Sequence, residues 1–347
     1  MSIKQVKTMK IVIDDKIPYI RETISMLTDD AVYKKGSEIC AEDVRDADAL
    51  IVRTRTRCDE NLLSGSRVSF VATATIGFDH IDAGYMRRAG IDWMSCPGCN
   101  AGSVGQYIRS VFLLMRYSLH MDLSSLTVGI VGCGHVGSKI TDVARSLGMR
   151  ILICDPPRQE RGDGTGFVTM DVIEHECDII TFHVPLTKDG PWPTYHMADE
   201  AFFSRLERRP VIINTSRGEV VDNAALLNAL QYNKVGRAVI DTWEHEPDIS
   251  LKLLDKVWIA TPHIAGYSAD GKVNADNMVI DGLCRHFGMR RPPLIVPPAL
   301  PQTHIPEYAD DPDLGLYNPL IDDRNLRSRP DMFEELRGNY RLRREKP

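Results

Sequence analysis

Three charged side chains in the second half of the sequence are of types that can bind a carboxylate and transfer a proton. Arg217 follows the apolar run VIINTS, Glu246 lies in the segment EHEP, and His263 follows the run VWIATP. A guanidinium binds a carboxylate through two parallel N–H bonds, and an imidazole exchanges protons near neutral pH. A carboxylate bonded to that imidazole fixes its tautomer and favours its protonated form. We therefore expect Arg217 to hold the substrate carboxylate, His263 to act as base, and Glu246 to orient it.

Each of these residues also has a simpler interpretation. An arginine after a strand is usually exposed, and a histidine in a loop is often only hydrogen-bonded there. Glu244 competes with Glu246 for the place beside the histidine. The functional hypothesis depends on the three positions together, because all of them follow strands of one expected sheet, at the edge where such sheets bind ligands.

A glycine-rich turn upstream predicts the cofactor site. The run TVGIV leads into the pattern G-x-G-x-x-G, and an acidic residue ends the next apolar run. The residues concerned are Gly132, Gly134, His135, Val136, Gly137 and Asp155. The first glycine permits a tight turn, the second leaves room for a pyrophosphate, and the third lets helix and strand pack closely. The free N–H groups at the start of the following helix attract phosphates.

The acidic residue of this pattern favours NAD over NADP. A carboxylate at Asp155 accepts hydrogen bonds from the ribose hydroxyls and repels a 2′-phosphate. Arg158, three residues on, weakens that preference slightly. The alternative is a glycine-rich turn in an α/β protein that binds no nucleotide.

The elements that would position these residues form two strand–helix series. Short apolar runs separated by helical segments indicate parallel strands that are covered on both faces. In the first series, strand-length runs are expected at 10–14, 49–54, 68–73 and 91–95, and helices at 19–27 and 80–89. A long helix at 101–117 follows, and the second series then has six apolar runs, the number of a doubly wound sheet.

The fold class expected is α/β, with a Rossmann-type doubly wound parallel sheet, a flavodoxin-like substrate lobe and a short C-terminal segment. A helix near 270–287 would return to the first lobe and make that lobe discontinuous. The expected parts are a substrate-binding lobe (1–98 and 267–290), an NAD-binding domain with the linking helix (99–266) and a C-terminal part (291–347).

The two ends of the chain have no core of their own. Seven prolines at 292–312 indicate a stiff linker, and the charged remainder is too short for a separate core. Residues 1–8 show no periodic pattern and are expected to be a loose extension.

Composition restricts partners and location. A net charge of −6 over 347 residues argues against a large face for nucleic acid. No apolar run reaches the roughly 18 residues of a membrane span, and no secretory signal is evident, so we expect a cytoplasmic protein. Cys96 and Cys99 form the only C-x-x-C, without a second ligand pair, so no metal site is expected. A redox pair is the alternative to a structural turn.

Taken in order, these motifs resemble the D-isomer-specific 2-hydroxyacid dehydrogenase family over residues 10–290. The resemblance is carried by the glycine turn and the segments NTSRGEVVD, DTWEHEP and TPHIAG. It implies that the arginine, glutamate and histidine of these segments, Arg217, Glu246 and His263, are catalytic. It also implies further NAD contacts from Thr215, Asp241 and Gly266, and substrate contacts from Thr54, Thr75 and Tyr267.

Other segments resemble one branch of that family, which acts in the pyridoxal-phosphate pathway. They are LICDPPRQERGD, FHVPLTKDGP, YHMADE, PHIAGYSADGK and RGNYRLRRE. The resemblance implies NAD-dependent oxidation of 4-phospho-D-erythronate to 2-oxo-3-hydroxy-4-phosphobutanoate. The alternatives are another D-2-hydroxy acid, such as 3-phosphoglycerate or the glyoxylate/hydroxypyruvate type, and a binding protein that senses NAD(H).

The run VRTRTR offers groups for a substrate phosphate. If the strand continues, Arg53, Arg55 and Arg57 share one face and can neutralise the phosphate. An exposed, charged strand end is the alternative for Arg55 and Arg57, whereas Arg53 matches the family pattern.

The sequence departs from the family pattern in three places. Val104-Gly105-Gln106 replaces a common Val-Ala-Glu in the linking helix, Val184 stands where Thr is frequent after His183, and the tail is short. A glycine inside a helix costs roughly 0.5–1 kcal/mol relative to alanine. Because the branch dimerises through its C-terminal domain, we expect a homodimer in which the tail contributes less.

Overall fold

The computed structural model describes residues 9–164, 166–299 and 311–346. The N-terminal extension expected at 1–8, and residues 300–310 of the proline-rich linker, lie outside the described residues. Within the described parts of the chain, no helix is both long enough and apolar enough to cross a membrane.

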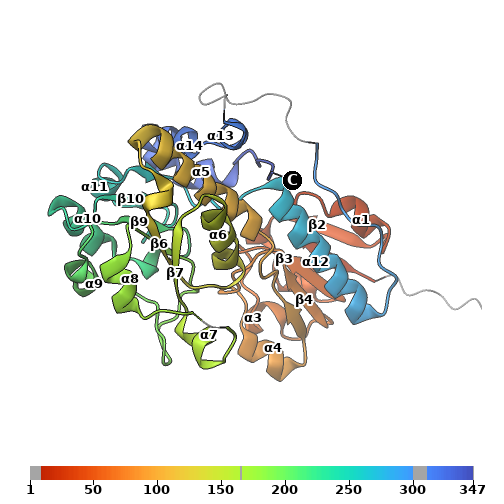
Figure 1. Cartoon of the computed structure of the whole chain (residues 1–347). Helices are drawn as coiled ribbons and strands as arrows, with labels where there is room; N and C mark the ends of the chain where they lie inside the picture. Colours follow the sequence, from red (N-terminus) through yellow and green to blue (C-terminus); the bar gives the residue numbers. More distant parts are fainter. Residues whose placement is uncertain (1–8, 165, 300–310, 347) are drawn as a thin grey trace, which may run out of the picture. The chain divides into compact units, whose positions relative to one another are not determined.

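The chain divides into two compact units, and each is discontinuous in sequence. Unit 1 comprises Met1–Asn100 with Ser268–Ala299, and unit 2 comprises Ala101–Tyr267 with Leu300–Pro347 (Figure 1). Residues 268–299 belong to the first unit, whereas the C-terminal segment belongs to the second.

Unit 1 is built on a five-stranded parallel sheet with the strand order β2-β1-β3-β4-β5. The strands are β1 (Ile11–Asp14), β2 (Ala31–Lys34), β3 (Ala49–Val52), β4 (Phe70–Thr73) and β5 (Asp92–Met94). The helices are α1 (Arg21–Ser25), α2 (Ala41–Val44), α3 (Glu60–Leu63), α4 (Ala83–Ala89) and α12 (Ala269–Phe287), with the 3₁₀ turn η1 (Gly36–Glu38). The sequence did not predict β2, because this edge strand is only half-buried and lacks a continuous apolar run.

Unit 2 is built on a six-stranded sheet with the order β11-β10-β9-β8-β6-β7, as the count of apolar runs predicted. The strands are β6 (Thr127–Val131), β7 (Arg150–Cys154), β8 (Ile179–Phe182), β9 (Val211–Asn214), β10 (Arg237–Ile240) and β11 (Ile259–Ala260). All neighbouring strands in it are parallel. The chain leaves β6 for β7 on one side and returns to β8 on the other. This reversal is the topological switch point where such sheets bind ligands.

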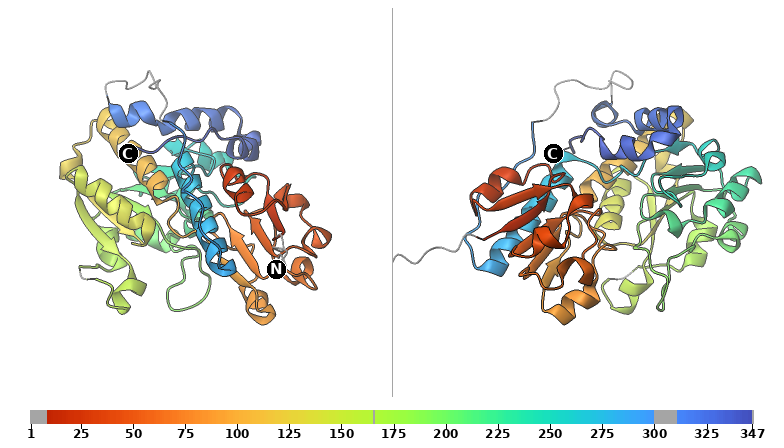
Figure 2. Two further views of the ribbon diagram at one scale, coloured as in Figure 1. Left: turned by 90° about the vertical axis from the view of Figure 1, so that its right-hand side faces the viewer. Right: turned by 180° about the vertical axis from the view of Figure 1, so that it is seen from behind.

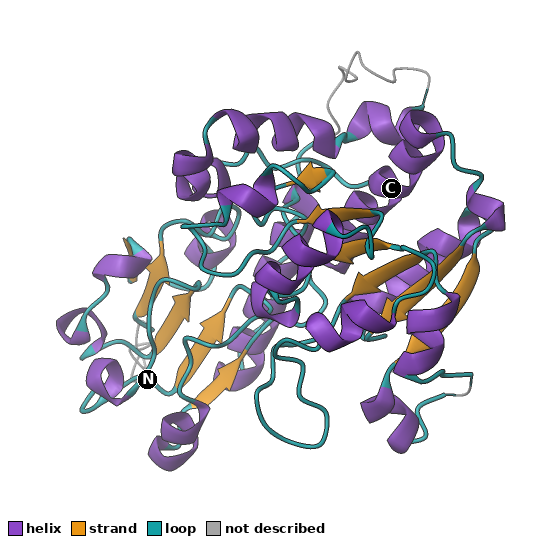
Figure 3. Ribbon diagram, turned by 90° about the vertical axis from the view of Figure 1, so that its left-hand side faces the viewer, coloured by secondary structure: helices purple, strands orange, loops and turns teal. Residues whose placement is uncertain are grey.

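The helices of unit 2 cover both faces of its sheet (Figure 3). They are α5 (Ala101–Leu119), α6 (His135–Ser146), α7 (Pro156–Glu160), α8 (Met170–Glu176), α9 (Glu200–Arg205), α10 (Asn223–Gln231) and α11 (Leu251–Leu254), with the 3₁₀ turns η2 (Leu123–Ser125) and η3 (Gly218–Val220). Successive residues of one strand enter different cores: Ile212 packs with α9 and α10, whereas Ile213 packs with α5 and α6. Burial on both faces explains why most positions of these strands are apolar, with exposed arginines only at the first residues of β7 and β10.

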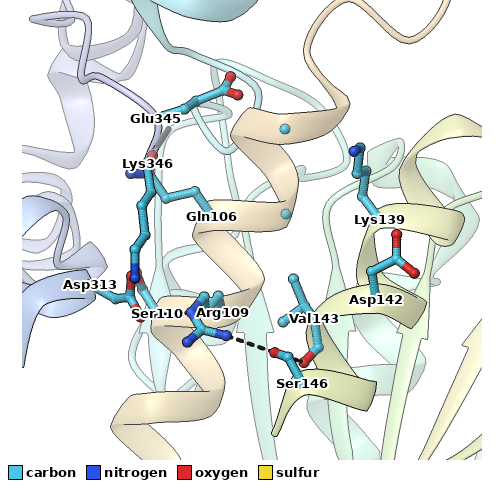
Figure 4. Close-up of a pocket in the computed structure, with 12 residues that line it drawn as sticks. Gln106, Arg109, Ser110, Lys139, Asp142, Val143, Ser146, Asp313, Glu345 and Lys346 are labelled. Carbon is cyan, nitrogen blue, oxygen red and sulfur yellow. Dashed lines mark hydrogen bonds and ion pairs between the residues drawn. The ribbon is translucent and has the colours of Figure 1, made fainter.

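The C-terminal segment packs onto its own unit. Its helices are α13 (Pro312–Leu316), α14 (Pro319–Ser328) and α15 (Phe333–Gly338), with the 3₁₀ turn η4 (Pro330–Met332). Figure 2 shows them in dark blue, and α13 and α14 lie beside α5. Asp313 accepts hydrogen bonds from Arg109 of α5 at 2.7 Å and from Lys346 at 2.9 Å, next to a surface pocket between α5 and α6 (Figure 4).

The same segment completes the edge of the sheet at β11. Asp323 of α14 is buried, and its carboxylate accepts a hydrogen bond from the backbone N–H of Ala260 at 2.7 Å. Arg327 binds that carboxylate and donates to the carbonyls of Leu254 and Val257. Side chains of the tail thus replace the neighbouring strand that β11 lacks.

We expect Asp323→Ala to lower the free energy of unfolding by about 2–3 kcal/mol, because it leaves the buried amide of Ala260 without its partner and the Arg327 guanidinium without its counter-charge. Urea denaturation followed by circular dichroism measures the loss. The matched control is Asp331→Ala, at an exposed aspartate of the same segment, with a change within about 0.5 kcal/mol. Equal stability of both variants would show that the tail is not part of the cooperative unit.

Candidate active site

The glycine turn after β6 has the geometry that a dinucleotide site requires. Gly132 has φ +86°, a conformation that favours glycine. A Cβ on Gly137 would overlap the carbonyl oxygen of Gly132, whereas a Cβ on Gly134 would meet no protein atom within 4 Å. The middle glycine therefore borders open space at the start of α6, where His135 is exposed and Val136 is half-buried. This open space and the helix N-terminus fit a bound pyrophosphate.

Asp155 directly follows β7 and binds the backbone of this glycine turn. Its Oδ2 accepts a hydrogen bond from the backbone N–H of Cys133 at 2.7 Å, and its Oδ1 accepts one from the N–H of Arg158 at 3.0 Å. The Arg158 guanidinium turns back to the carbonyl of Cys133. The carboxylate that is expected to bind the ribose is thus held rigidly beside the glycine turn.

His183 follows β8 on the other side of the switch point. Its Nε2 lies 2.8 Å from the hydroxyl of Thr181, and its Nδ1 lies 3.3 Å from the hydroxyl of Thr215. Burial lowers the pKa of His183 to about 3, so the ring is neutral at physiological pH. A neutral ring between two hydroxyls suits a site for an uncharged part of a cofactor. The sequence analysis did not assign His183 to the site.

Glu246 and His263 meet in unit 2. The His263 Nδ1 lies 2.8 Å from Glu246 Oε2, and Glu246 Oε1 accepts a hydrogen bond from the N–H of Trp243 at 2.9 Å. The two side chains are 24% and 16% exposed. Burial raises the pKa of Glu246, but the hydrogen bond and charge of His263, and the charge of Arg337, outweigh burial, so the pKa is lowered overall. An ionised carboxylate therefore orients the imidazole at neutral pH.

The competing carboxylate, Glu244, has another partner. Its Oε1 lies 2.6 Å from Nε2 of His196, and its Oε2 accepts a hydrogen bond from the N–H of Asn223. The structure therefore separates the two candidates that the sequence left open beside the histidine: Glu246, and not Glu244, is bonded to His263.

Asp241 holds the loop that carries His263. This carboxylate is buried and accepts hydrogen bonds from the hydroxyl of Thr261 and from the N–H groups of Ile264 and Ala265, at 2.6–3.0 Å. His263 has φ +57°, a left-handed conformation that is uncommon for residues other than glycine. Gly266 and Tyr267, which complete the loop before α12, are half-buried.

Arg217 lies in the loop after β9. Buried Asn214 holds that loop, because its amide donates to the carbonyl of Arg217 and its oxygen accepts from Ser216. The neighbouring Gly218 packs so closely on the carbonyl of Trp243 that a Cβ would overlap it. The backbone at Arg217 is thereby held beside the Trp243–Glu246 loop, and the half-buried guanidinium donates to the carbonyl of Ser216 at 2.9 Å.

The expected substrate residues of unit 1 follow two adjacent strands. Val52 of β3 lies opposite Thr73 of β4, so Arg53, Thr54 and Thr75 are at the same edge of that sheet. Thr54 is exposed, and the Thr75 hydroxyl donates to the carbonyl of Gly77. Arg53 donates to the carbonyl of Lys16, and its buried Nε has no partner among the described residues.

The expected continuation of β3 is wrong. The strand ends at Val52, and the next residues form turns, so Arg53, Arg55 and Arg57 do not share a strand face. Arg57 instead pairs with Asp59 at 2.9 Å. Thr56 is buried and donates to the carbonyl of Gly36, which bends the chain away from the sheet.

Comparisons with known proteins identify the class first. Residues 109–265 match the family model of the D-isomer specific 2-hydroxyacid dehydrogenase, NAD binding domain. The crystal structure of D-lactate dehydrogenase from Aquifex aeolicus, complexed with NAD and lactic acid, has a TM-score of 0.66 and 25% identity, covering 80% of this chain and 96% of its own. The expected α/β fold, the NAD cofactor and the dehydrogenase class are confirmed.

Two curated relatives extend the similarity to nearly the whole chain. An erythronate-4-phosphate dehydrogenase of Bacteroides fragilis (strain YCH46) is 53% identical over 339 residues, 97% of each chain. One of Porphyromonas gingivalis (strain ATCC BAA-308 / W83) is 42% identical over 343 residues, 96% of this chain and 92% of the relative. The chain belongs to the erythronate-4-phosphate dehydrogenase family.

We expect two glycine variants to separate cofactor binding from folding. Gly137→Ala places a methyl group on the Gly132 carbonyl, so it lowers both NAD affinity and stability, the latter by about 1–3 kcal/mol. Gly134→Ala meets no protein atom and changes stability by less than about 1 kcal/mol, yet it weakens NAD binding on the order of tenfold. Calorimetric titration with NAD and thermal unfolding measure the two effects. Unchanged NAD affinity in Gly134→Ala would exclude this turn as the pyrophosphate site.

Proposed function

We propose that this protein oxidises 4-phospho-D-erythronate to 2-oxo-3-hydroxy-4-phosphobutanoate with NAD, in pyridoxal-phosphate biosynthesis. The names of its curated relatives support the substrate. The observation that carries the proposal is the 2.8 Å contact between Glu246 and His263, next to the loop of Arg217. Glu246 and His263 together would supply a base with a fixed tautomer, and Arg217 would supply a cation for the substrate carboxylate.

The three residues divide the work of the reaction. Arg217 binds the C1 carboxylate through its guanidinium. Glu246 accepts a hydrogen bond from Nδ1–H of His263, which leaves Nε2 free to take the proton of the C2 hydroxyl. The cofactor held at the glycine turn would supply the acceptor for the hydride that leaves C2. The imidazolium formed is stabilised by the Glu246 carboxylate, and His263 returns the proton in the reverse reaction.

The cofactor residues are proposed on their placement around the switch point of unit 2. The glycine turn with Asp155 would hold the pyrophosphate and the ribose. Thr215 lies beside His183, and Asp241 supports the loop of Gly266. Thr215, Asp241 and Gly266 would therefore border the nicotinamide end. Both oxygens of Asp241 already bind protein donors, which favours a supporting role for this carboxylate.

The remaining parts of the proposal concern the substrate, the assembly and the location. Arg53, Thr54, Thr75 and Tyr267 would contact the phosphorylated substrate, and the partner-free buried Nε of Arg53 supports its inclusion. The parts 1–98 with 267–290, 99–266 and 291–347 would form the substrate lobe, NAD domain and tail of a cytoplasmic homodimer.

A substrate panel tests the reaction. We expect NADH to form with 4-phosphoerythronate and NAD, and kcat/KM to be at least about a hundredfold lower with unphosphorylated erythronate, because a bound phosphate contributes charge-assisted hydrogen bonds. Glycerate, lactate and 3-phosphoglycerate complete the panel, each with NAD and with NADP. Turnover only of one of these three acids would reject the proposed substrate.

Replacement of the base tests the mechanism. His263→Asn should lower kcat by about 10²–10⁴-fold while NAD affinity stays within about threefold, because asparagine accepts the left-handed backbone but cannot take a proton. Glu246→Gln should also lower kcat, whereas Glu244→Gln, the matched control, should not, because Glu244 binds His196 instead. Full turnover in His263→Asn would remove this residue from the reaction.

A further inference from the structure

A cation from the C-terminal segment reaches the pair of Glu246 and His263. Arg337 of α15 places its Nη1 3.6 Å from Glu246 Oε2, the same oxygen that contacts His263. Its Nε donates a hydrogen bond to the hydroxyl of Tyr267 at 3.3 Å. The side chain is 23% exposed, so solvent screens its charge only partly. Two cationic groups therefore share one carboxylate oxygen whenever His263 is protonated.

The segment holds Arg337 in this place from both sides. Phe333, four residues before it, is fully buried in the core of unit 2. Arg343, six residues after it, is buried, and its guanidinium donates to the carbonyls of Ile264 and Ala265, directly after His263. The tail thus grips the loop of the base, and Arg337 is presented to Glu246 by a fixed backbone.

The charged groups around His263 come from three elements of unit 2. Asp241 and Glu246 are both acidic, and both come after the end of β10. Arg337 of α15 is the cation in contact with Glu246, and Glu334 of the same helix lies 3.8 Å from its Nη1. Arg217 lies in the loop after β9, beside the loop that carries Glu246. The charge of Arg343 lies between the rings of Tyr317 and Tyr340 and is directed to backbone carbonyls. Without Arg337, two carboxylates would act on the imidazole with no opposing guanidinium at Glu246.

We propose that Arg337 is a positioning residue that holds Glu246 against His263 and, by sharing its charge, sets the pH range in which the base works. This inference rests on the proposed role of His263 in the reaction. The sign follows from electrostatics: a positive charge beside Glu246 disfavours a second positive charge on the imidazole. His263 must be neutral to accept the hydroxyl proton, so Arg337 extends oxidation toward lower pH.

The pH dependence of kcat/KM in Arg337→Met tests the proposal. We expect the acid limb of the oxidation profile to move to higher pH by about 0.5–1 unit, because protonation of the base becomes easier. In the reduction of the oxo acid, where the base must carry the proton, the alkaline limb should move in the same direction. Arg337→Lys keeps the charge and should restore at least half of the shift. Arg341→Met, at an exposed arginine of the same segment, should leave both limbs in place.

The outcomes separate a charge effect from a loss of structure. A purely structural role would lower activity at every pH without moving either limb, and it would overturn the proposal. An equal shift in Arg341→Met, or no restoration by lysine, would do the same. NAD affinity and thermal unfolding report on the fold of each variant. The profiles are measured with any 2-hydroxy acid that the wild type oxidises, so a wrong substrate in the proposed function leaves this test intact.

Discussion

The contact between Glu246 and His263 is the interaction on which the candidate site depends. Neither residue is placed by a helix or strand: both lie in loops beyond the sheet, and other side chains hold those loops. Trp243 donates its backbone N–H to Glu246, and buried Asp241 binds the N–H groups directly after His263. The left-handed backbone at His263 persists because these contacts over-determine it.

The sheet of unit 2 explains why these loops meet. Parallel strands put all their carboxyl ends at one edge, so the loops after β6, β8, β9, β10 and β11 lie along the same border. The glycine turn lies at the switch point, and the base lies toward the other end of that edge. A cofactor that spans the border would have its phosphates at one place and its reacting ring at the other.

The C-terminal segment contacts both the edge strand β11 and the loop that carries His263. A short, charged tail without a core suggests a surface for a partner, yet in this structure it is bound into its own unit. Asp323 supplies the missing hydrogen-bond partner of β11, and Arg343 binds the carbonyls of the loop that carries His263. A tail that closes a strand edge and binds the loop of His263 links the stability of the unit to the geometry of the candidate site.

The sequence by itself determined the parallel α/β architecture, the glycine turn and the candidate triad, because buried parallel strands and phosphate-binding turns impose local patterns. It did not reveal β2 or the end of β3 at Val52, since a half-buried edge strand and a bent chain leave no periodic signal. His183 was also not assigned to the site from the sequence. Only the tertiary structure decided between Glu244 and Glu246, two residues apart, and brought Arg337 to a carboxylate 91 positions earlier. Long-range pairing depends on how loops and tail pack, and no local preference of the chain encodes it.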